Sequence, residues 1–232
     1  MLVVITGASK GIGFELVKQF SKNSDYLIIA VSRNTKSIEN YINQTNTLNV
    51  LSVKADITSK ESLLKLKNLI KKLKKPVFAL INNAGLILNK DFFKIQKLEI
   101  ENVYATNVIA PFLLTQTLAP FMGKTIKSHI VNISSMGGFQ GSSKFSGLSA
   151  YSSSKSALCG LTECLAEEFK TKNISVNCLA IGAVQTEMLA KAFPGYKAPL
   201  LPKEMAAFIY YFTCNGHQFF NGKILPVSST TP

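Results

Sequence analysis

Six short apolar runs, none of which alternates with polar residues, recur along the 232-residue chain. They cover residues 2–5, 26–31, 50–53, 77–81, 130–133 and 174–179. Runs of this length without alternation suit strands that are buried on both faces of a sheet. The pattern therefore predicts six strands in the interior of one sheet.

Between these runs, apolar residues recur at helical spacing. The helical stretches are 12–20, 59–73, 99–121, 151–169 and 203–212. Strands that alternate with helices form right-handed crossovers, and these give a parallel sheet with helices on both faces. We therefore predict an α/β fold of the Rossmann type, doubly wound, in which ligands bind beyond the carboxyl ends of the strands.

Length and composition predict a single domain over residues 1–232. Hydrophobic residues make up 47% of the chain and charged residues 17%, which is typical of a folded protein. One stretch, 187–202, contains three prolines and a glycine among apolar residues. This stretch is predicted to be a mobile substrate loop that closes as a lid.

The net charge of +13 is the unusual feature of the composition. Many lysines lie in residues 60–75, opposite a stripe of leucines on one amphipathic helix, which would open with a capping box from Thr58 to Glu61. Because no aromatic residues interleave with the lysines, a solvated helix face is favoured over nucleic-acid binding. No apolar run reaches the ~20 residues that span a bilayer, so no membrane partner is expected either.

Neither metal binding nor disulfide formation is indicated by the cysteines. None stands in a CxxC pair or at a metal-ligand spacing from a histidine, and we interpret all four as reduced structural thiols: Cys159, Cys164, Cys178 and Cys214. The N-terminus enters the first strand-like run with no basic segment and cleavage site before it. A cytoplasmic location is therefore expected.

A glycine-rich turn follows the first strand-like run and leads into an amphipathic helix. Such a turn lets backbone N–H groups and the positive end of the helix approach a pyrophosphate. A plain tight turn is the alternative, but the position directly after the first strand favours phosphate binding. The residues expected at the phosphates are Gly7, Ser9, Lys10, Gly11, Ile12 and Gly13.

Tyr151 and Lys155 stand four residues apart at the start of a helical stretch, so their side chains share one helix face. A phenol with an ordinary pKa near ~10 is a poor base at neutral pH, and a neighbouring ammonium group stabilises the phenolate. We therefore expect Lys155 to lower the pKa of Tyr151. Alone, such a pair is common on helix surfaces, so its specificity comes from the other motifs.

The GxxxGxG spacing and the Tyr-Lys pair together resemble the short-chain dehydrogenase/reductase family, over most of the chain. The resemblance implies that the segment 82–85 braces the sheet beside the adenosine half of a dinucleotide and that Asp56 contacts the adenine. Without the family resemblance, the alternative interpretations are an Asn-rich turn for 82–85 and an Asp that precedes a helix for Asp56. The cofactor contacts implied here are Asp56, Ile57, Asn83, Ala84 and Gly85.

The resemblance also implies four catalytic residues: Asn107, Ser135, Tyr151 and Lys155. Asn107 and Pro111 are both unfavourable within the helical stretch that contains them. The resemblance implies that Asn107 holds a water in a proton relay. Ser135, rather than Ser134, would hydrogen-bond the substrate oxygen as charge develops on it. In reduction, hydride would pass from the nicotinamide to the carbonyl carbon while Tyr151 protonates the oxygen.

Three departures from the family pattern are present. After the sixth strand-like run, Ile181 replaces the usual proline, although Val184 and Thr186 would still reach the nicotinamide. The segment 136–150 is slightly lengthened, and its glycines and serines suggest a flexible insertion beside the substrate. The closing segment 221–228 lacks the usual Asp-Gly-Gly ending, which puts C-terminal packing and assembly in question.

The end of the second strand-like run predicts the cofactor preference. Arg33 stands where NAD-selective sites place a carboxylate, and its guanidinium suits a 2′-phosphate. Lys10 matches a second basic position of family members that use NADP. Both side chains could instead be merely solvated, but their positions favour NADP(H) over NAD(H).

The sequence thus predicts an NADP(H)-dependent oxidoreductase that acts on a small carbonyl or alcohol substrate. It would associate as a homodimer or homotetramer through the helices around 108–118 and 158–165. The alternative is a non-catalytic NADP(H)-binding sensor or regulatory protein. The residues expected to line the substrate site suggest an apolar or aromatic substrate: Met188, Leu189, Phe193 and Tyr196.

Overall fold

Seven parallel strands form one sheet in the computed structural model, which describes residues 1–229. The strand order is β3-β2-β1-β4-β5-β6-β7. The strands are β1 (Leu2–Thr6), β2 (Leu27–Ser32), β3 (Val50–Lys54), β4 (Val77–Asn82), β5 (Ser128–Ser135), β6 (Ile174–Ile181) and β7 (Ile224–Val227). The doubly wound fold predicted from the sequence is confirmed, and the closing segment supplies the seventh strand.

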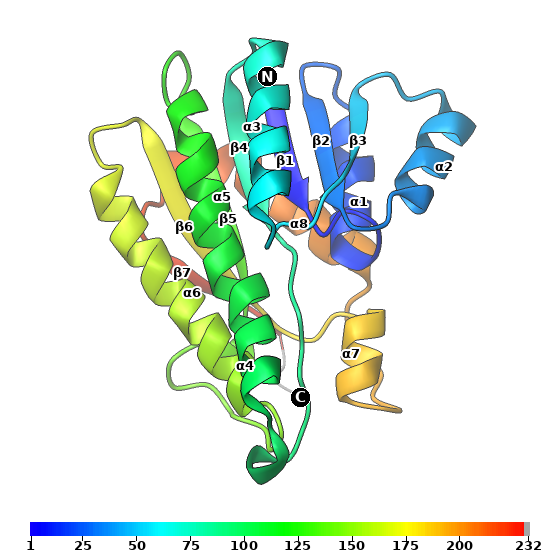
Figure 1. Ribbon diagram of the computed structural model, residues 1–232, viewed down its shortest axis with the longest axis vertical. Coiled ribbons are helices and arrows are strands. Elements are labelled where there is room, and N and C mark those ends of the chain that lie inside the picture. The colour runs from blue at the N-terminus through cyan, green and yellow to red at the C-terminus, as the bar shows by residue number, and fades with distance from the viewer. Residues whose placement is uncertain (230–232) are drawn as a thin grey trace.

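Helices cover both faces of this sheet. They are α1 (Gly11–Ser21), α2 (Lys36–Thr45), α3 (Lys60–Leu73), α4 (Lys97–Tyr104), α5 (Ala110–Leu118), α6 (Ser149–Glu168), α7 (Glu187–Ala192) and α8 (Pro202–Asn215). In Figure 1, α3, α5 and α6 lie in front of the sheet, whereas α1 and α8 lie behind it. The short elements are η1 (Phe92–Lys94), η2 (Ala105–Ile109), η3 (Ala119–Phe121), η4 (Met136–Gly138) and η5 (Gly216–Gln218).

Two apolar layers, one on each face of the sheet, hold the fold together. Val3 and Ile5 of β1 face the layer that contains Phe20 of α1, whereas Leu2 and Val4 face the layer of α3, α5 and α6. Adjacent strand residues point to opposite faces, so a strand without polar alternation fills both layers. The order of the strands reverses between β1 and β4, which is where doubly wound folds bind their ligands.

The structure corrects four details of the sequence-based assignment. Helix α2 was not predicted, because it contains few apolar residues and only Ile38 of its ten residues is buried. The stretch 99–121 is not one helix, since the π-helical segment η2 separates α4 from α5. Helix α3 is capped by Ser59, whose hydroxyl accepts from the Ser62 N–H, so the predicted Thr58 capping box is wrong.

The fourth correction concerns the predicted substrate loop, which is not wholly irregular. Its first six residues form α7, and the hydroxyl of Thr186 caps this helix by accepting from the Leu189 N–H. Helix α7 stands apart from the sheet, below β2 and β3 in Figure 1. Nowhere in residues 1–229 is a helix long and apolar enough to cross a bilayer.

Candidate active site

A cleft of about 730 Å³ opens beyond the carboxyl ends of the strands, at the place where their order reverses. Most of the residues predicted for the cofactor line it: Gly7, Ser9, Lys10, Gly11, Ile12, Arg33, Asp56, Ile57, Asn83, Ala84, Gly85, Tyr151, Lys155, Val184 and Thr186. Gly13 is buried in α1 and does not line the cleft. Ser135 lines the same cleft with Tyr151 and Lys155, whereas Asn107, the fourth predicted catalytic residue, is fully buried and does not line it.

The glycine-rich turn has the shape of a phosphate cradle. Gly7 has a φ of +65°, which favours glycine, and a methyl group at Gly13 would collide with the Gly7 carbonyl oxygen and the Asn83 amide. No side chain caps the N-terminus of α1, so the first N–H groups of this helix can receive an anion. The turn therefore fits the pyrophosphate of a dinucleotide.

The segment after β4 is fastened to the end of β1. The hydroxyl of Thr6 accepts hydrogen bonds from the N–H groups of Asn83 and Ala84, both at 3.0 Å. The Asn83 side chain in turn donates to the Thr6 carbonyl at 2.9 Å. One strand further on, Asn82 donates to Asn132 at 2.8 Å. These bonds fix the floor of the cleft, as expected for a bracing segment.

Tyr151 and Ser135 both line the cleft and are hydrogen-bonded to each other. Burial raises the pKa of the Tyr151 phenol above its ordinary value, whereas a hydrogen bond with Ser135 acts in the opposite direction. The Ser135 hydroxyl also accepts from the Gly137 N–H at 3.1 Å. Ser134 is the alternative serine, but it is buried and its hydroxyl donates to the Lys155 carbonyl. Ser135 is therefore the serine free to meet a substrate.

The pKa of Tyr151 is raised by burial, not lowered as expected from its spacing with Lys155. The Lys155 ammonium group donates to the Ile133 carbonyl at 2.8 Å and lies 5.9 Å from the centre of the Tyr151 ring. Burial lowers the pKa of Lys155 to about 8, and no lowering of the Tyr151 pKa by Lys155 is found. The shared helix face brings the two residues together, but the lysine side chain runs on to β5.

Asn107 is buried in the π-helical segment η2. Its side-chain amide donates to the Leu86 carbonyl and to Ser154, both at 2.9 Å, and its oxygen accepts from the Leu86 N–H. A methyl group at Gly85 would lie 3.5 Å from the Lys155 nitrogen and 3.6 Å from the Asn107 oxygen. Lys155 and Asn107 thus face the same small space beside Tyr151.

Basic side chains line the part of the cleft that follows β2. Arg33 is exposed after β2 and lines the cleft beside Lys36, which the sequence analysis did not single out. The Arg33 charge contributes to a lowered pKa of Asp56, although hydrogen bonds from Thr58 contribute more. Lys10, the second predicted phosphate ligand, instead pairs with Glu187 at 2.6 Å.

Three segments meet at the end of the cleft beside α7. The rings of Phe145 and Phe193 are in edge contact, with centroids 5.4 Å apart. The Asn89 amide donates to the Ala192 carbonyl at 2.7 Å, which ties α7 to the segment after β4. The Lys90 N–H donates to the Gly147 carbonyl at 2.9 Å. The predicted flexible insertion is therefore held by specific contacts on two sides.

Apolar side chains dominate this end of the cleft. Met188, Leu189 and Phe193 line it as predicted, whereas Tyr196 does not. Other lining residues were not singled out individually: Lys36, Ser37, Ile87, Phe145, Leu148 and Glu187. Phe145, Leu148 and Glu187 belong to segments that were expected beside the substrate, whereas only the position of Lys36, Ser37 and Ile87 after β2 and β4 could have suggested them.

A doubly wound parallel sheet with a glycine-rich phosphate cradle and a Ser-Tyr-Lys group in one cleft defines a dinucleotide-binding protein of the oxidoreductase class. The family model for short chain dehydrogenase matches residues 1–197. The chain belongs to this family, as the resemblance in its motifs predicted.

Similar proteins act on diverse substrates. The chain is 32% identical to an L-xylulose reductase of Caenorhabditis elegans, over 80% of this chain and 72% of that protein. It is 29% identical to a 3-oxoacyl-acyl-carrier-protein reductase of Aquifex aeolicus, over 97% and 94%. A solved structure of 7α-hydroxysteroid dehydrogenase with NADH and 7-oxo glycochenodeoxycholic acid superposes with a TM-score of 0.89, at 28% identity over 99% and 93% of the two chains.

Proposed function

We propose that this protein is an NADP(H)-dependent oxidoreductase that interconverts a carbonyl and an alcohol in a small, largely apolar molecule. The observation that carries the proposal is the joint position of Ser135, Tyr151 and Lys155 in the cleft that contains the phosphate cradle. When bound, the nicotinamide supplies or accepts the hydride. All other steps are assigned to side chains of the chain itself.

Tyr151 is the proposed acid and base. Because burial raises the pKa of the Tyr151 phenol, this residue is neutral near pH 7 and can give its proton to a carbonyl oxygen during reduction. Ser135 donates a hydrogen bond to the same oxygen and stabilises the charge that develops on it. In alcohol oxidation Tyr151 has to lose its proton first, so this direction is favoured by higher pH.

Lys155 and Asn107 have supporting roles in this proposal. Below pH 8 the Lys155 ammonium is charged, and its contact with the Ile133 carbonyl holds it beside the cleft. The Asn107 amide has both hydrogens engaged, so its side chain fixes the segment around Leu86 and η2. A water held in this space would connect Tyr151 to solvent and complete the proton relay.

The cofactor preference rests on Arg33. No carboxylate stands at the end of β2, and Arg33 and Lys36 line the adenosine end of the cleft. A guanidinium group in this position suits a 2′-phosphate better than a ribose hydroxyl. The solved structure of 7α-hydroxysteroid dehydrogenase contains NADH, so the proposal requires that Arg33 and Lys36 after β2 give this chain a different preference from that neighbour.

The substrate class follows from the apolar lining at the end of the cleft next to Tyr151. Ile87, Leu148, Met188 and Phe193 present no hydrogen-bond donors to a polyol. Such a lining favours an aliphatic, aromatic or steroid-like carbonyl compound. Residues 187–202, which carry part of this lining, are proposed to move as the lid that admits it.

Self-association and a cytoplasmic location belong to the same proposal. Ile109, at the end of η2, and Phe112, on α5, expose 52% and 47% of their surface within the stretch 108–118 that is expected to associate. Exposed apolar side chains on one helical surface are typical of a homodimer or homotetramer interface. The cytoplasm supplies the soluble dinucleotide that the cleft would bind.

A panel of carbonyl compounds tests the proposed activity through the loss of NADPH absorbance. Aliphatic, aromatic and steroidal ketones should be reduced more efficiently than sugars of similar size. A non-catalytic NADP(H) sensor, the alternative function, would bind NADPH with no turnover of any compound. Binding and turnover are therefore measured on the same preparation.

A further inference from the structure

Two buried thiols meet behind the active site, between α6 and β6. The sulfur atoms of Cys159 and Cys178 are 3.9 Å apart, and both side chains are buried. No disulfide links them, and neither has a part in the proposed mechanism. The sequence indicated no pairing, since the two residues lie on different elements and form no CxxC motif.

A chain of hydrogen bonds connects these thiols to the active site. The Cys159 thiol donates to the Ser134 hydroxyl at 3.5 Å, and Ser134 donates to the main-chain carbonyl of Lys155 at 2.9 Å. Cys159 also lies one helical turn after Lys155, on the same face of α6. A change at Cys159 therefore reaches the helical turn that carries Lys155.

The two thiols have different reactivity. A hydrogen bond from Cys178 lowers the pKa of Cys159, and the Lys155 charge acts in the same direction. The same contact and burial raise the pKa of Cys178. Because the thiolate is the nucleophile in thiol chemistry, Cys159 is suited to attack an oxidant and Cys178 to resolve the product.

We propose that Cys159 and Cys178 are a redox modification site, at which a hydroperoxide closes a disulfide that displaces Lys155. The Cys159 thiolate attacks one oxygen of hydrogen peroxide, the O–O bond breaks, and the products are a sulfenic acid and hydroxide. The Cys178 sulfur then attacks the Cys159 sulfur, forming the S–S bond and releasing water. In sum, two thiols and one peroxide give one disulfide and two waters.

Closing this bond requires a movement that would change the positions of groups in the active site. The sulfur atoms must approach from 3.9 Å to about 2.05 Å, the length of a disulfide. Turning the Cys159 side chain toward Cys178 breaks its hydrogen bond to Ser134. The Ser134 hydroxyl then loses one partner, and the turn of α6 that holds Lys155 shifts toward β6.

The route for the oxidant runs through the cleft. Ser134 and Lys155 line the cleft and separate it from Cys159. A molecule as small and neutral as hydrogen peroxide can pass this layer during local motion, whereas a bulky thiol reagent cannot. A dinucleotide in the cleft would cover Ser134 and Lys155, so bound NADPH should slow the oxidation.

The test treats the purified protein with hydrogen peroxide and maps disulfides by mass spectrometry of a non-reduced digest. We expect a Cys159–Cys178 crosslink, with the loss of two hydrogen atoms, and slower formation when NADPH is present. Because this readout needs no turnover, it stands even if the proposed reductase activity fails. Absence of this crosslink, with oxidation confined to exposed Cys164 or to sulfonic acids, would overturn the inference.

Turnover gives the second readout. The crosslinked protein should lose activity by about a hundredfold, as expected when a catalytic group is displaced by ~1 Å, and dithiothreitol should restore it. Cys164→Ala, on the same helix but exposed, should behave like the wild type. After the same peroxide treatment, Cys178→Ala should form no crosslink and keep most of its activity, because a sulfenic acid on Cys159 cannot close the disulfide. A crosslinked protein with full activity would refute the link to Lys155.

Discussion

The ammonium group of Lys10 and the carboxylate of Glu187 lie 2.6 Å apart across the cofactor cleft. Lys10 precedes α1, and Glu187 begins α7, so the pair connects the phosphate cradle to the substrate segment. Their neighbours are also close, because a methyl group at Gly11 would lie 3.5 Å from the Thr186 side chain. A phosphate that binds at Lys10 has to compete with Glu187 for this cation.

Glu187→Gln should therefore tighten NADPH binding. The variant frees Lys10 for a cofactor phosphate, and because an exposed ion pair is weak, the gain in affinity should be severalfold at most. Fluorescence titration with NADPH measures the change. Glu167→Gln is the matched control, since it removes an exposed lysine partner at the far end of α6. Weaker NADPH binding in the Glu187 variant would show that the pair supports the cofactor site.

Tyr151→Phe should abolish turnover and leave NADPH binding largely intact. The substitution removes the transferable proton and keeps the buried ring, so the packing of α6 against the sheet is retained. Steady-state kinetics and cofactor titration of the same preparation test both statements. Tyr211→Phe, at an exposed position on α8, serves as the control. Near wild-type turnover in the Tyr151 variant would remove this residue from the mechanism.

Arg33→Ala should weaken NADPH binding and spare NADH binding. A charge-assisted hydrogen bond contributes roughly 1.5 to 3 kcal/mol, which corresponds to about a tenfold to hundredfold loss of affinity for the phosphorylated cofactor. The measurement is the dissociation constant of each dinucleotide for the wild type and the variant, with NADH as the internal control. An equal loss for the two cofactors would contradict the assignment of Arg33 to the 2′-phosphate.

Phe112→Glu should dissociate the proposed oligomer. A glutamate on the exposed surface of α5 would place a charge inside the interface, where it would lack a partner. Size-exclusion chromatography with light scattering at micromolar concentration should give a dimer or tetramer for the wild type and a monomer for the variant. Leu48→Glu, at a position that is 94% exposed in the loop after α2, should leave the assembly unchanged. A monomeric wild type would reject the proposal.

Most strands of the sheet could be predicted because each contains a short, continuous run of apolar residues. Strands such as β1 and β4 are buried on both faces, so their composition alone identifies them. Helix α2 escaped prediction for the opposite reason, since it buries only Ile38. The break at η2 was also missed, although Asn107 and Pro111 were recognised as unfavourable in a continuous helix.

The sequence predicted many of the residues that line the site, but it did not predict which side chains contact one another. Motif spacing identified Tyr151 and Lys155, yet only the fold shows that the lysine reaches Ile133. Likewise, Lys10 was expected at a phosphate, and its contact with Glu187 depends on how two distant segments come together. Long-range pairs of this kind leave no periodic signal in the sequence.

Lys155→Met should abolish turnover and, below pH 8, increase the free energy of unfolding. Burial lowers the pKa of Lys155 from its ordinary 10.5 to about 8, so the folded state releases this proton before the unfolded state does. Below pH 8 both states are protonated, and the folded protein bears the cost of a buried ammonium group, about 3 kcal/mol from the difference in pKa. Between pH 8 and pH 10.5 the unfolded state binds more protons, so wild-type stability gains from this group as the pH rises.

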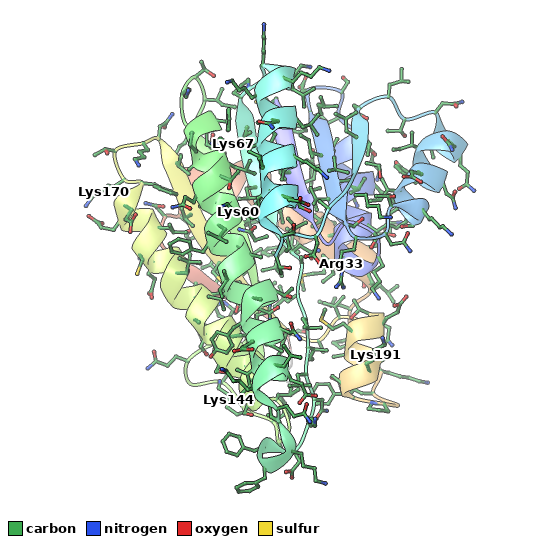
Figure 2. All side chains as sticks on the ribbon, viewed as in Figure 1. Arg33, Lys60, Lys67, Lys144, Lys170 and Lys191 are labelled. Atoms are coloured by element: carbon green, nitrogen blue, oxygen red, sulfur yellow. The ribbon has the colours of Figure 1, made fainter. Side chains whose placement is uncertain are left out.

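The methionine variant has no such titration, and the pH dependence of the stability difference is therefore the test. The variant also leaves the Ile133 carbonyl without its donor, but this cost is the same at every pH. Denaturant unfolding should show the advantage of Lys155→Met over the wild type largest below pH 8 and shrinking toward pH 10.5, while turnover is lost throughout. Lys67→Met, on the surface of α3 in Figure 2, should show no such trend. If the difference in unfolding free energy between Lys155→Met and the wild type stayed constant with pH, the buried ammonium group of Lys155 would not destabilise the folded protein.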